Sequence, residues 1–228
     1  MEVAAIVAAA GLGTRLGRGS KALVELNGRT TLARAVALFL ALDEVNRIVV
    51  LGPPDRIEEA RAEVVALRPH KPVEVCAGGE SRQQSVRFGL LRLAGTDYVL
   101  VHDAARPLAT VALCRRVLAA ALESGAAIPG LPTPDAVKRV ERGRVVESLD
   151  RAQIVLAQTP QAFAYELLLE AHQEAEATGL AGDDDAQLVG AGGHPVTVVA
   201  GEPANFKLTT AEDLDVMEAL LHGQEAVR

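Results

Sequence analysis

Residues 3–28 read VAAIVAAAGLGTRLGRGSKALVELNG, and this stretch decides the fold. It begins with an unbroken apolar run over residues 3–10 and then breaks into four glycines interspersed with basic residues. Continuous apolar runs of this length are typical of strands buried inside parallel sheets. A glycine-rich loop directly after such a strand leaves backbone N–H groups available to an anion. The stretch therefore predicts a buried first strand followed by an anion-binding loop.

This loop fits neither of the two most familiar phosphate-binding motifs. Its glycines start at Gly11 like a dinucleotide-binding fingerprint, but Leu16 stands where the third glycine is required. A Walker A loop needs Gly-Lys-Ser or Gly-Lys-Thr, and the chain contains neither tripeptide. Three cations lie in the loop instead, namely Arg15, Arg18 and Lys21. These cations and the available backbone N–H groups predict a site for a strongly anionic ligand.

The bulk composition indicates a single domain over residues 1–228. Apolar residues make up 49% of the chain and aromatic residues only 3%, which favours helices and strands packed through Ala, Val and Leu. The net charge of −7 argues against a nucleic-acid-binding surface, so an anionic ligand must meet a local cluster of cations.

Cysteine usage and hydropathy indicate a cytoplasmic protein. Cys76 and Cys114 fall inside an expected strand and an expected helix, so we expect reduced core thiols rather than a disulfide. The apolar run at residues 3–10 follows Glu2 without a basic segment and is too short to span a bilayer. We therefore expect neither a signal peptide nor contact with a membrane.

Short apolar runs alternate with longer amphipathic stretches along the chain. The expected strands are residues 3–9, 47–51, 73–76, 98–101, 126–129 and 195–199. The expected helices are residues 31–42, 55–67, 81–93, 110–124, 164–177 and 210–222. Ser81 and Gln84 have the spacing of a capping box. Thr209 and Glu212 repeat this spacing before the last helix. The alternation predicts an α/β fold with a Rossmann-like, mostly parallel sheet covered by helices on both faces.

One segment, residues 133–161, interrupts this alternation. It contains two short β-like runs, residues 137–141 and 144–149, around Arg142 and Gly143. The pattern predicts a protruding β-hairpin arm inserted within the domain. Because a lone two-stranded hairpin is marginally stable in water, the arm should pack against something. The pattern leaves open whether it is a flap on its own domain or an arm that embraces a second subunit.

Four polar stretches follow expected strands and should therefore meet at one edge of the sheet, where open α/β sheets bind ligands. They are residues 8–21, 78–85, 102–107 and 205–213. In the third stretch, Asp103 could contact Mg²⁺ or a ligand hydroxyl, or serve as a turn residue paired with Arg106. His102 beside it is better interpreted as a hydrogen-bonded strand-end histidine than as a general base. The run Asp183–Asp184–Asp185 is interpreted as helix N-terminal capping with solvated charge.

The sequence offers glycines and cations but no recognisable nucleophile or base. A phosphomonoester, however, is largely dianionic at neutral pH and needs no base to act as a nucleophile. Its attack on the α-phosphorus of a nucleoside triphosphate requires mainly positioning and charge neutralisation. Nucleotidyl transfer to a phosphorylated alcohol therefore fits these residues.

Several motifs in their order along the chain resemble the 2-C-methyl-D-erythritol 4-phosphate cytidylyltransferase family. The opening loop is similar to that of nucleotidyltransferases in general. The more specific motifs are AGGESRQQSV (77–86), VHDAARP (101–107), LDR (149–151), QTPQ (158–161) and NFKLTTAEDL (205–214). The resemblance implies transfer of CMP from CTP to methylerythritol phosphate in the non-mevalonate isoprenoid pathway. It also implies Mg²⁺ as cofactor and a homodimer with crossed arms.

The resemblance further implies a role for individual residues. Arg15 and Lys21 would stabilise charge at the α-phosphate, and Asp103 and Arg106 would lie between nucleotide and polyol phosphate. The residues implied to surround cytosine and ribose are Ala9, Ala10, Gly11, Gly79, Glu80 and Ser85. Arg151 on the arm and Lys207 would orient the polyol phosphate. Mg²⁺ would be held mainly by the triphosphate, with Asp103 as a candidate additional ligand.

Two positions depart from the family pattern and keep alternatives open. Ala136 and Asp183 stand where relatives often have threonines that serve the polyol phosphate. A ribitol 5-phosphate cytidylyltransferase is therefore the closest alternative. A nicotinamide-dependent oxidoreductase and a catalytically silent nucleotide-binding module are more distant ones.

Overall fold

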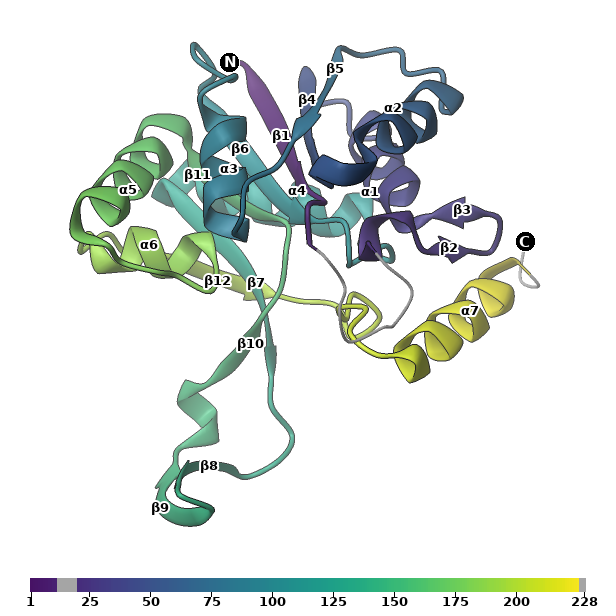
Figure 1. Ribbon diagram of the computed structural model, residues 1–228. Coiled ribbons are helices and arrows are strands. Elements are labelled where there is room, and N and C mark those ends of the chain that lie inside the picture. Colours follow the sequence, from purple (N-terminus) through teal and green to yellow (C-terminus); the bar gives the residue numbers. More distant parts are fainter. Residues whose placement is uncertain (12–19, 226–228) are drawn as a thin grey trace.

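A mostly parallel sheet forms the centre of the molecule, as Figure 1 shows for the computed structural model, which describes residues 1–11 and 20–225. The strands run in the order β12-β7-β11-β6-β1-β4-β5, and β10 continues the edge of β7 that β11 pairs with. The parallel strands are β1 (Val3–Ala8), β4 (Arg47–Gly52), β5 (Val73–Ala77), β6 (Tyr98–Asp103), β7 (Ala126–Pro132) and β12 (Thr197–Ala200). These are the six expected strands, so the predicted sheet is confirmed.

The sequence did not predict the two antiparallel strands of this sheet, β10 (Val155–Ala157) and β11 (Gln161–Ala164). β11 fills the space between β6 and β7 and pairs with both. The Gln-Thr-Pro-Gln run at residues 158–161 resembles a loop, and only pairing with strands distant in sequence makes its end a strand.

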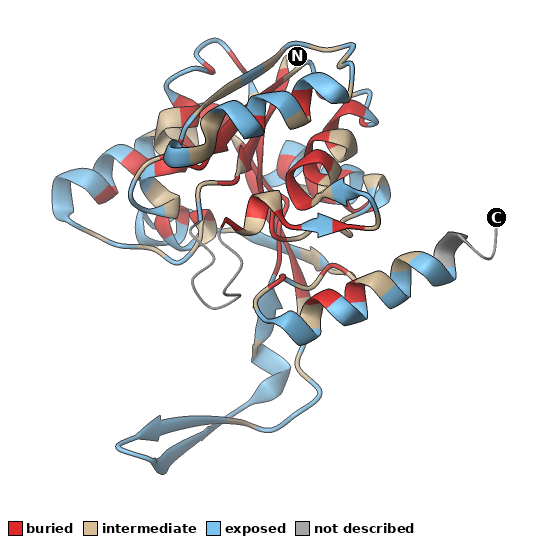
Figure 2. Ribbon diagram, turned by 45° about the vertical axis from the view of Figure 1, so that its right-hand side comes forward, coloured by how far each residue is buried: buried red, intermediate tan, exposed pale blue. Residues whose placement is uncertain are grey.

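Helices cover both faces of the sheet, as predicted. α1 (Thr31–Leu40), α2 (Ile57–Ala66) and α4 (Val111–Ser124) share one hydrophobic core with the sheet. α3 (Arg82–Leu90), α5 (Tyr165–Thr178) and α6 (Asp185–Ala191) share the other. Alternate residues of β1 enter the two cores, and Figure 2 shows the strands buried between the layers. No helix in the described part of the chain has both the length and the apolar character of a membrane span.

The C-terminal helix α7 (Ala211–Glu225) lies beside the main body and has a small core of its own. Its Leu214 and Met217 pack with Val24 and Leu26, which come from the segment around the short hairpin β2 (Glu25–Leu26) and β3 (Arg29–Thr30). The start of α7 differs by one residue from the prediction. Thr210 and Asp213, rather than Thr209 and Glu212, form the reciprocal capping pair, whereas Ser81 caps α3 through the N–H of Gln84 as expected.

The described residues also form three short 3₁₀ turns. They are η2 (Lys21–Leu23), η3 (Pro54–Arg56) and η4 (Arg151–Gln153). Of these, η2 follows residues 12–19 in the sequence, and η4 lies between β9 of the arm and β10 of the sheet.

The predicted hairpin is present as β8 (Val137–Glu141) and β9 (Arg144–Leu149). Arg142 and Gly143 both have positive φ angles, 49° and 76°, as the tight turns of two-stranded hairpins require. Figures 1 and 2 show that the hairpin β8–β9 stands away from the helices, and β9 is exposed along its length. The end of the expected arm segment differs, because residues 158–161 are buried and lead into β11 of the central sheet. Six apolar side chains from β8 to β10 are exposed: Val140, Val145, Val146, Leu149, Val155 and Leu156.

His102 at the end of β6 is fully buried and hydrogen-bonded, as expected for a strand-end histidine. Its Nε2 lies 3.2 Å from the carbonyl of Arg106 and its Nδ1 lies 2.9 Å from the hydroxyl of Thr159. Its ring also meets Phe39 edge to face. Burial lowers the pKa of His102 to about 4, so the imidazole is neutral at physiological pH.

This burial predicts an acid-sensitive step in stability. Above the ordinary histidine pKa of about 6.5, His102 is neutral in the folded and the unfolded chain; below it only the unfolded chain takes up the proton. The free energy of unfolding should therefore fall by on the order of 2 kcal/mol between pH 7.5 and pH 4.5 through this residue alone. Urea unfolding of the wild type and His102→Asn at both pH values measures it. Equal pH dependence in the two proteins would contradict the prediction.

Candidate functional site

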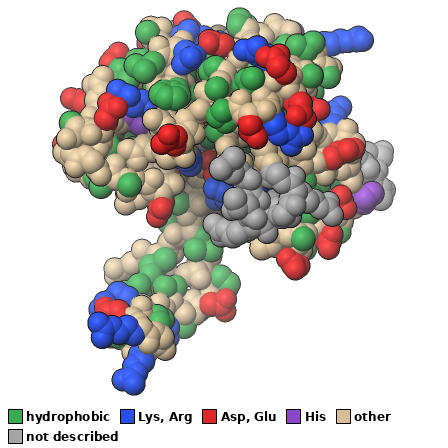
Figure 3. Space-filling view, viewed as in Figure 1, with side chains coloured by type: hydrophobic (Ala, Val, Ile, Leu, Met, Phe, Trp, Pro, Cys, Tyr) green, Lys and Arg blue, Asp and Glu red, His purple; other side chains and the backbone are tan. Residues whose placement is uncertain are grey.

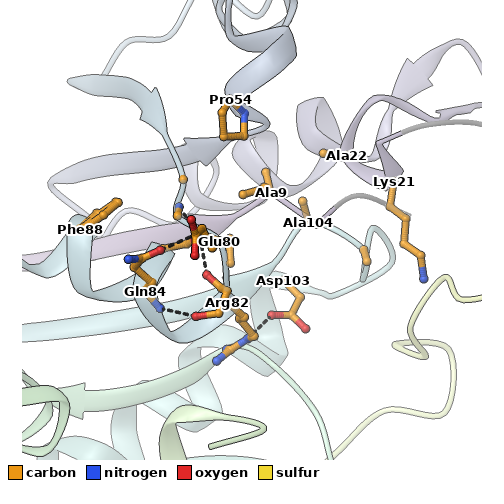
Figure 4. Close-up of a pocket in the computed structure, with 18 of the residues that line it drawn as sticks. Ala9, Lys21, Ala22, Pro54, Glu80, Arg82, Gln84, Phe88, Asp103 and Ala104 are labelled. Carbon is orange, nitrogen blue, oxygen red and sulfur yellow. Dashed lines mark hydrogen bonds and ion pairs between the residues drawn. The ribbon is translucent and has the colours of Figure 1, made fainter. Parts of the chain in front are cut away.

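The four polar stretches converge on one pocket of about 730 Å³ at the carboxyl ends of β1, β5 and β6. Nine of the predicted site residues line it: Ala9, Ala10, Gly11, Lys21, Gly79, Glu80, Ser85, Asp103 and Lys207. Figure 4 shows several of these side chains around the cavity. The structure therefore confirms that the four stretches lie together at the ends of the strands.

Small residues allow the backbone to come close on one side of the pocket. A Cβ on Gly78 would overlap the Cβ of Ala10 and lie 2.9 Å from the hydroxyl of Ser85, so only glycine fits there. Ser85 also stabilises the loop before α3, because its hydroxyl accepts a hydrogen bond from the N–H of Gly79 at 2.9 Å. The side chain of Gln84 accepts from the N–H of Glu80 at 2.6 Å. The first turn of α3 thus fixes the shape of the loop before it.

Asp103 is a buried carboxylate held between two cations. Its Oδ1 lies 2.8 Å from Nε of Arg82, and its Oδ2 lies 2.7 Å from Nζ of Lys207. Burial alone would raise the pKa of Asp103, but the charges of Arg82 and Lys207 outweigh it and hold the pKa well below its ordinary value. Asp103 is therefore ionised throughout the physiological range.

The alternative interpretation of Asp103 as a turn residue paired with Arg106 holds for the backbone but not for the side chains. The two residues do form a turn, because the N–H of Arg106 donates to the carbonyl of Asp103 at 2.9 Å. The guanidinium of Arg106 instead donates to the carbonyls of Asn205 and Ala157, at 2.8 and 3.2 Å. It thereby joins the loop before α7 to the base of the arm, and it does not line the pocket.

Arg82 is the pocket residue that sequence reasoning missed. Besides Asp103 it contacts Asp185, whose Oδ2 lies 2.8 Å from Nη2 of Arg82. Burial would lower the pKa of Arg82, but the two carboxylates outweigh it and raise the pKa. Arg82 lay within the motif at residues 77–86, but its partners at positions 103 and 185 are far away in sequence.

The interpretation of the aspartate run was right for one residue and wrong for another. Asp184 caps α6, accepting from the N–H of Gln187 at 2.9 Å. Asp185 is completely buried instead of solvated, and its Oδ1 lies 2.9 Å from Nε2 of His172. Burial would raise the pKa of Asp185, but Arg82 and His172 hold it below its ordinary value. Three consecutive aspartates carry no local signal that tells which of them faces the interior.

The loop before α7 carries Lys207 and is firmly attached to the body. The side chain of Gln158 bonds both the N–H and the carbonyl of Glu202, at 3.0 and 2.9 Å. The side chain of Asn205 donates to the carbonyl of Thr159 at 2.8 Å. The ammonium of Lys21 donates to the carbonyl of Leu208 at 2.8 Å, so the first and last loops meet beside the pocket.

Three predicted site residues, and Asp183 at a position that departs from the family pattern, do not line this pocket within the described part of the chain. Arg151 and Ala136 are exposed on or near the arm, and the guanidinium of Arg151 donates to the carbonyl of Pro134. Asp183 is exposed at the start of α6, and Arg106 points to the arm base. Arg15 lies outside the described residues.

The described residues do not form a metal-binding cage. They contain no group of three or more His, Cys, Asp or Glu side chains placed to hold a metal ion. Asp103, the candidate ligand, has each carboxylate oxygen in contact with a cation. The donor set therefore does not fit a metal ion bound mainly by protein ligands.

Comparison with known proteins identifies the family. The family model described as "IspD: 2-C-methyl-D-erythritol 4-phosphate cytidylyltransferase" matches residues 3–223. A bifunctional enzyme IspD/IspF of Anaeromyxobacter dehalogenans is 45% identical over 99% of this chain, which spans 58% of that protein's length. A 2-C-methyl-D-erythritol 4-phosphate cytidylyltransferase of Acidobacterium capsulatum is 44% identical over 95% of each chain.

A solved structure leads to the same family. The 2-C-methyl-D-erythritol 4-phosphate cytidylyltransferase of Thermus thermophilus superposes with a TM-score of 0.79 at 38% identity, covering 97% of this chain and 100% of that one. With a match over residues 3–223 and this agreement in structure, the chain belongs to the 2-C-methyl-D-erythritol 4-phosphate cytidylyltransferase family.

Proposed function

We propose that this chain transfers CMP from CTP to 2-C-methyl-D-erythritol 4-phosphate, releasing pyrophosphate, in the non-mevalonate route to isoprenoids. The observation that carries the proposal is the convergence of all four polar stretches on one pocket in a chain of this family. Incubation with CTP and each polyol phosphate, followed by pyrophosphate detection, tests it. Turnover of ribitol 5-phosphate alone would overturn it in favour of the closest alternative, and CTP binding without pyrophosphate release would favour a silent binding module.

The nucleotide binds on the side of the pocket formed by β1 and the loop before α3. Ala9, Ala10 and Gly11 have small side chains or none, so the base and ribose can approach the backbone closely. Gly79, Glu80 and Ser85 face them from the opposite loop. Lys21 reaches the α-phosphate from η2, and Arg15 acts on it from the opening loop.

The reaction requires charge neutralisation rather than an enzymic base. An oxygen of the polyol phosphate attacks the α-phosphorus of CTP, and the bond from that phosphorus to the bridging oxygen breaks, so that pyrophosphate leaves with its electron pair. The attacking phosphate arrives largely as a dianion. His102, the nearest candidate base, is buried with both ring nitrogens hydrogen-bonded and does not line the pocket.

Magnesium reaches this site as part of the nucleotide. Mg²⁺ prefers a few carboxylates, phosphate oxygens and water, and a triphosphate supplies such oxygens. Since Arg82 and Lys207 already occupy both oxygens of Asp103, the triphosphate is the main ligand and Asp103 stays paired with cations.

The polyol half of the site combines residues of two subunits. Lys207 lies at the pocket, whereas Arg151 lies on the arm of the same chain and away from the pocket. The exposed apolar side chains on the arm favour a partner in water, and Figure 3 shows basic side chains gathered at the arm tip. A homodimer with crossed arms covers these side chains and brings Arg151 to the partner's pocket. The chain is thus one nucleotidyltransferase domain, and within residues 133–161 the part from β8 to η4 is its dimerisation arm.

The two departures from the family pattern affect only the polyol side. Ala136 and Asp183 lack the hydroxyl of threonine, and each lost neutral hydrogen bond costs about 0.5–1.5 kcal/mol. Binding of methylerythritol phosphate is weaker for this reason but is retained through Arg151 and Lys207. Both cysteines are free thiols, with the pKa of the Cys114 thiol raised to about 12 by burial, in keeping with a cytoplasmic enzyme.

Replacing Lys21 tests the charge-stabilising role. If its ammonium stabilises charge as pyrophosphate leaves, Lys21→Ala should lower kcat by about 10²–10³. Loss of its hydrogen bond to the carbonyl of Leu208 should lower the unfolding free energy by about 1 kcal/mol. Lys71→Ala is the matched control, because its ammonium caps the carbonyls of Phe39 and Leu42 away from the pocket and should leave kcat unchanged. Near-normal turnover of Lys21→Ala would remove this residue from the mechanism.

The pH profile tests the absence of a base. On the acid side, kcat/KM for the polyol phosphate should follow the second ionisation of that phosphate, near pH 6. His102→Asn should keep the same profile. Loss of the acid limb in this variant would identify His102 as a base.

Mixed dimers test the crossed arms. Lys21→Ala and Arg151→Ala should each be nearly inactive as homodimers, because every site carries one lesion. In a mixed dimer both lesions fall in one site and the other is intact, so random re-association should restore about a quarter of wild-type activity. Mass spectrometry first establishes that subunits exchange. Mixed dimers without recovered activity would show that each arm serves its own chain.

A further inference from the structure

A chain of alternating charges runs from the pocket into the interior of the protein. Its four charges are Lys207, Asp103, Arg82 and Asp185, and the ring of His172 lies at its inner end; the successive distances are 2.7, 2.8, 2.8 and 2.9 Å. These residues come from the loop before α7, β6, α3, α6 and α5. Figure 4 shows Arg82 and Asp103 pointing toward each other at the pocket.

Arg82 connects the exposed and the buried halves of this chain. Its side chain is 22% exposed and contacts both carboxylates, of which Asp103 is 8% and Asp185 is 1% exposed. The planar guanidinium can serve two carboxylates with separate nitrogens, which the single ammonium of a lysine does less well. His172, fully buried on α5, holds the far oxygen of Asp185. Arg82 is therefore fixed from behind by packed helices, and it fixes Asp103 in turn.

This arrangement determines how Lys207 is held at the pocket. Its side chain is 42% exposed and would be mobile on its flexible stem without the contact to Asp103. Since Arg82 neutralises the same carboxylate, Asp103 can hold the ammonium in place without presenting an uncompensated negative charge to an incoming phosphate dianion. A preorganised cation loses less entropy when the phosphate binds.

We propose that Arg82 is a positioning residue for the polyol phosphate, acting through Asp103 and Lys207 rather than by touching the substrate. The proposal rests on the proposed function, because it concerns the second substrate of that reaction. Replacement of Arg82 leaves Asp103 with only Lys207 as a partner. The lysine is then held more tightly by the carboxylate, and the carboxylate repels the phosphate.

Steady-state kinetics of Arg82→Gln test the proposal. The KM for methylerythritol phosphate should rise on the order of 10–100-fold, the range for a charged hydrogen bond, while the KM for CTP changes less than about threefold. Arg87→Gln is the matched control on the same helix, because Arg87 pairs with Glu176 outside the pocket. It should leave both KM values unchanged. An equal rise in both KM values for Arg82→Gln would overturn the proposal.

Arg82→Lys keeps the test decisive if Arg82→Gln does not fold. The lysine retains the charge but contacts one carboxylate, so the KM for methylerythritol phosphate should still rise by about tenfold. An unchanged KM in Arg82→Lys, with thermal unfolding like that of the wild type, would contradict a positioning role.

A double-mutant cycle tests whether the effect passes through Lys207. If it does, Arg82→Gln should lower kcat/KM by less than about threefold once Lys207→Ala is present, because contacting residues are not additive. The same fold-loss in both backgrounds would overturn this route. The wild-type assay separates the two proposals: absence of wild-type turnover overturns both, whereas wild-type turnover with an unchanged KM in Arg82→Gln overturns only this one.

Discussion

Asp103 lies at the carboxyl end of β6 with 8% of its side chain exposed, where an unpaired carboxylate would be strongly destabilising. Arg82 at the start of α3 and Lys207 in the loop before α7 balance its charge. The requirement to pair one buried charge therefore holds the loop before α3 and the loop before α7 against the end of a central strand. The pocket has its shape because these loops cannot separate without exposing that charge.

Small residues and side-chain hydrogen bonds make the remaining contacts around the pocket. Gly78 and Ala10 let the segments after β5 and β1 come close together, because a Cβ on Gly78 would overlap the Cβ of Ala10. Polar side chains then secure the loops: Ser85 and Gln84 on one side, and Gln158 on the other. The sheet thus carries backbone surfaces that a nucleotide can contact. A few cations neutralise the charge of the nucleotide.

The arm differs from the rest of the molecule in the exposure of its apolar side chains. Its strands pair with each other and leave several apolar side chains exposed. The body, by contrast, buries both faces of its sheet within one chain. The described pocket contains Lys207 but not Arg151, and in the proposed dimer the arm of a second copy supplies that arginine.

The sequence by itself determined the features that depend on local periodicity. The six parallel strands, the six long helices and the hairpin at Arg142–Gly143 follow from apolar spacing and turn residues. The gathering of four polar stretches also follows, because parallel strands end at the same edge. Only the tertiary structure decided the insertion of β11, the burial of Asp185 and the ion pairs of Arg82. These depend on contacts between residues 20 to 100 or more positions apart, and neither a strand pairing nor a buried charge is visible in the residues that flank it.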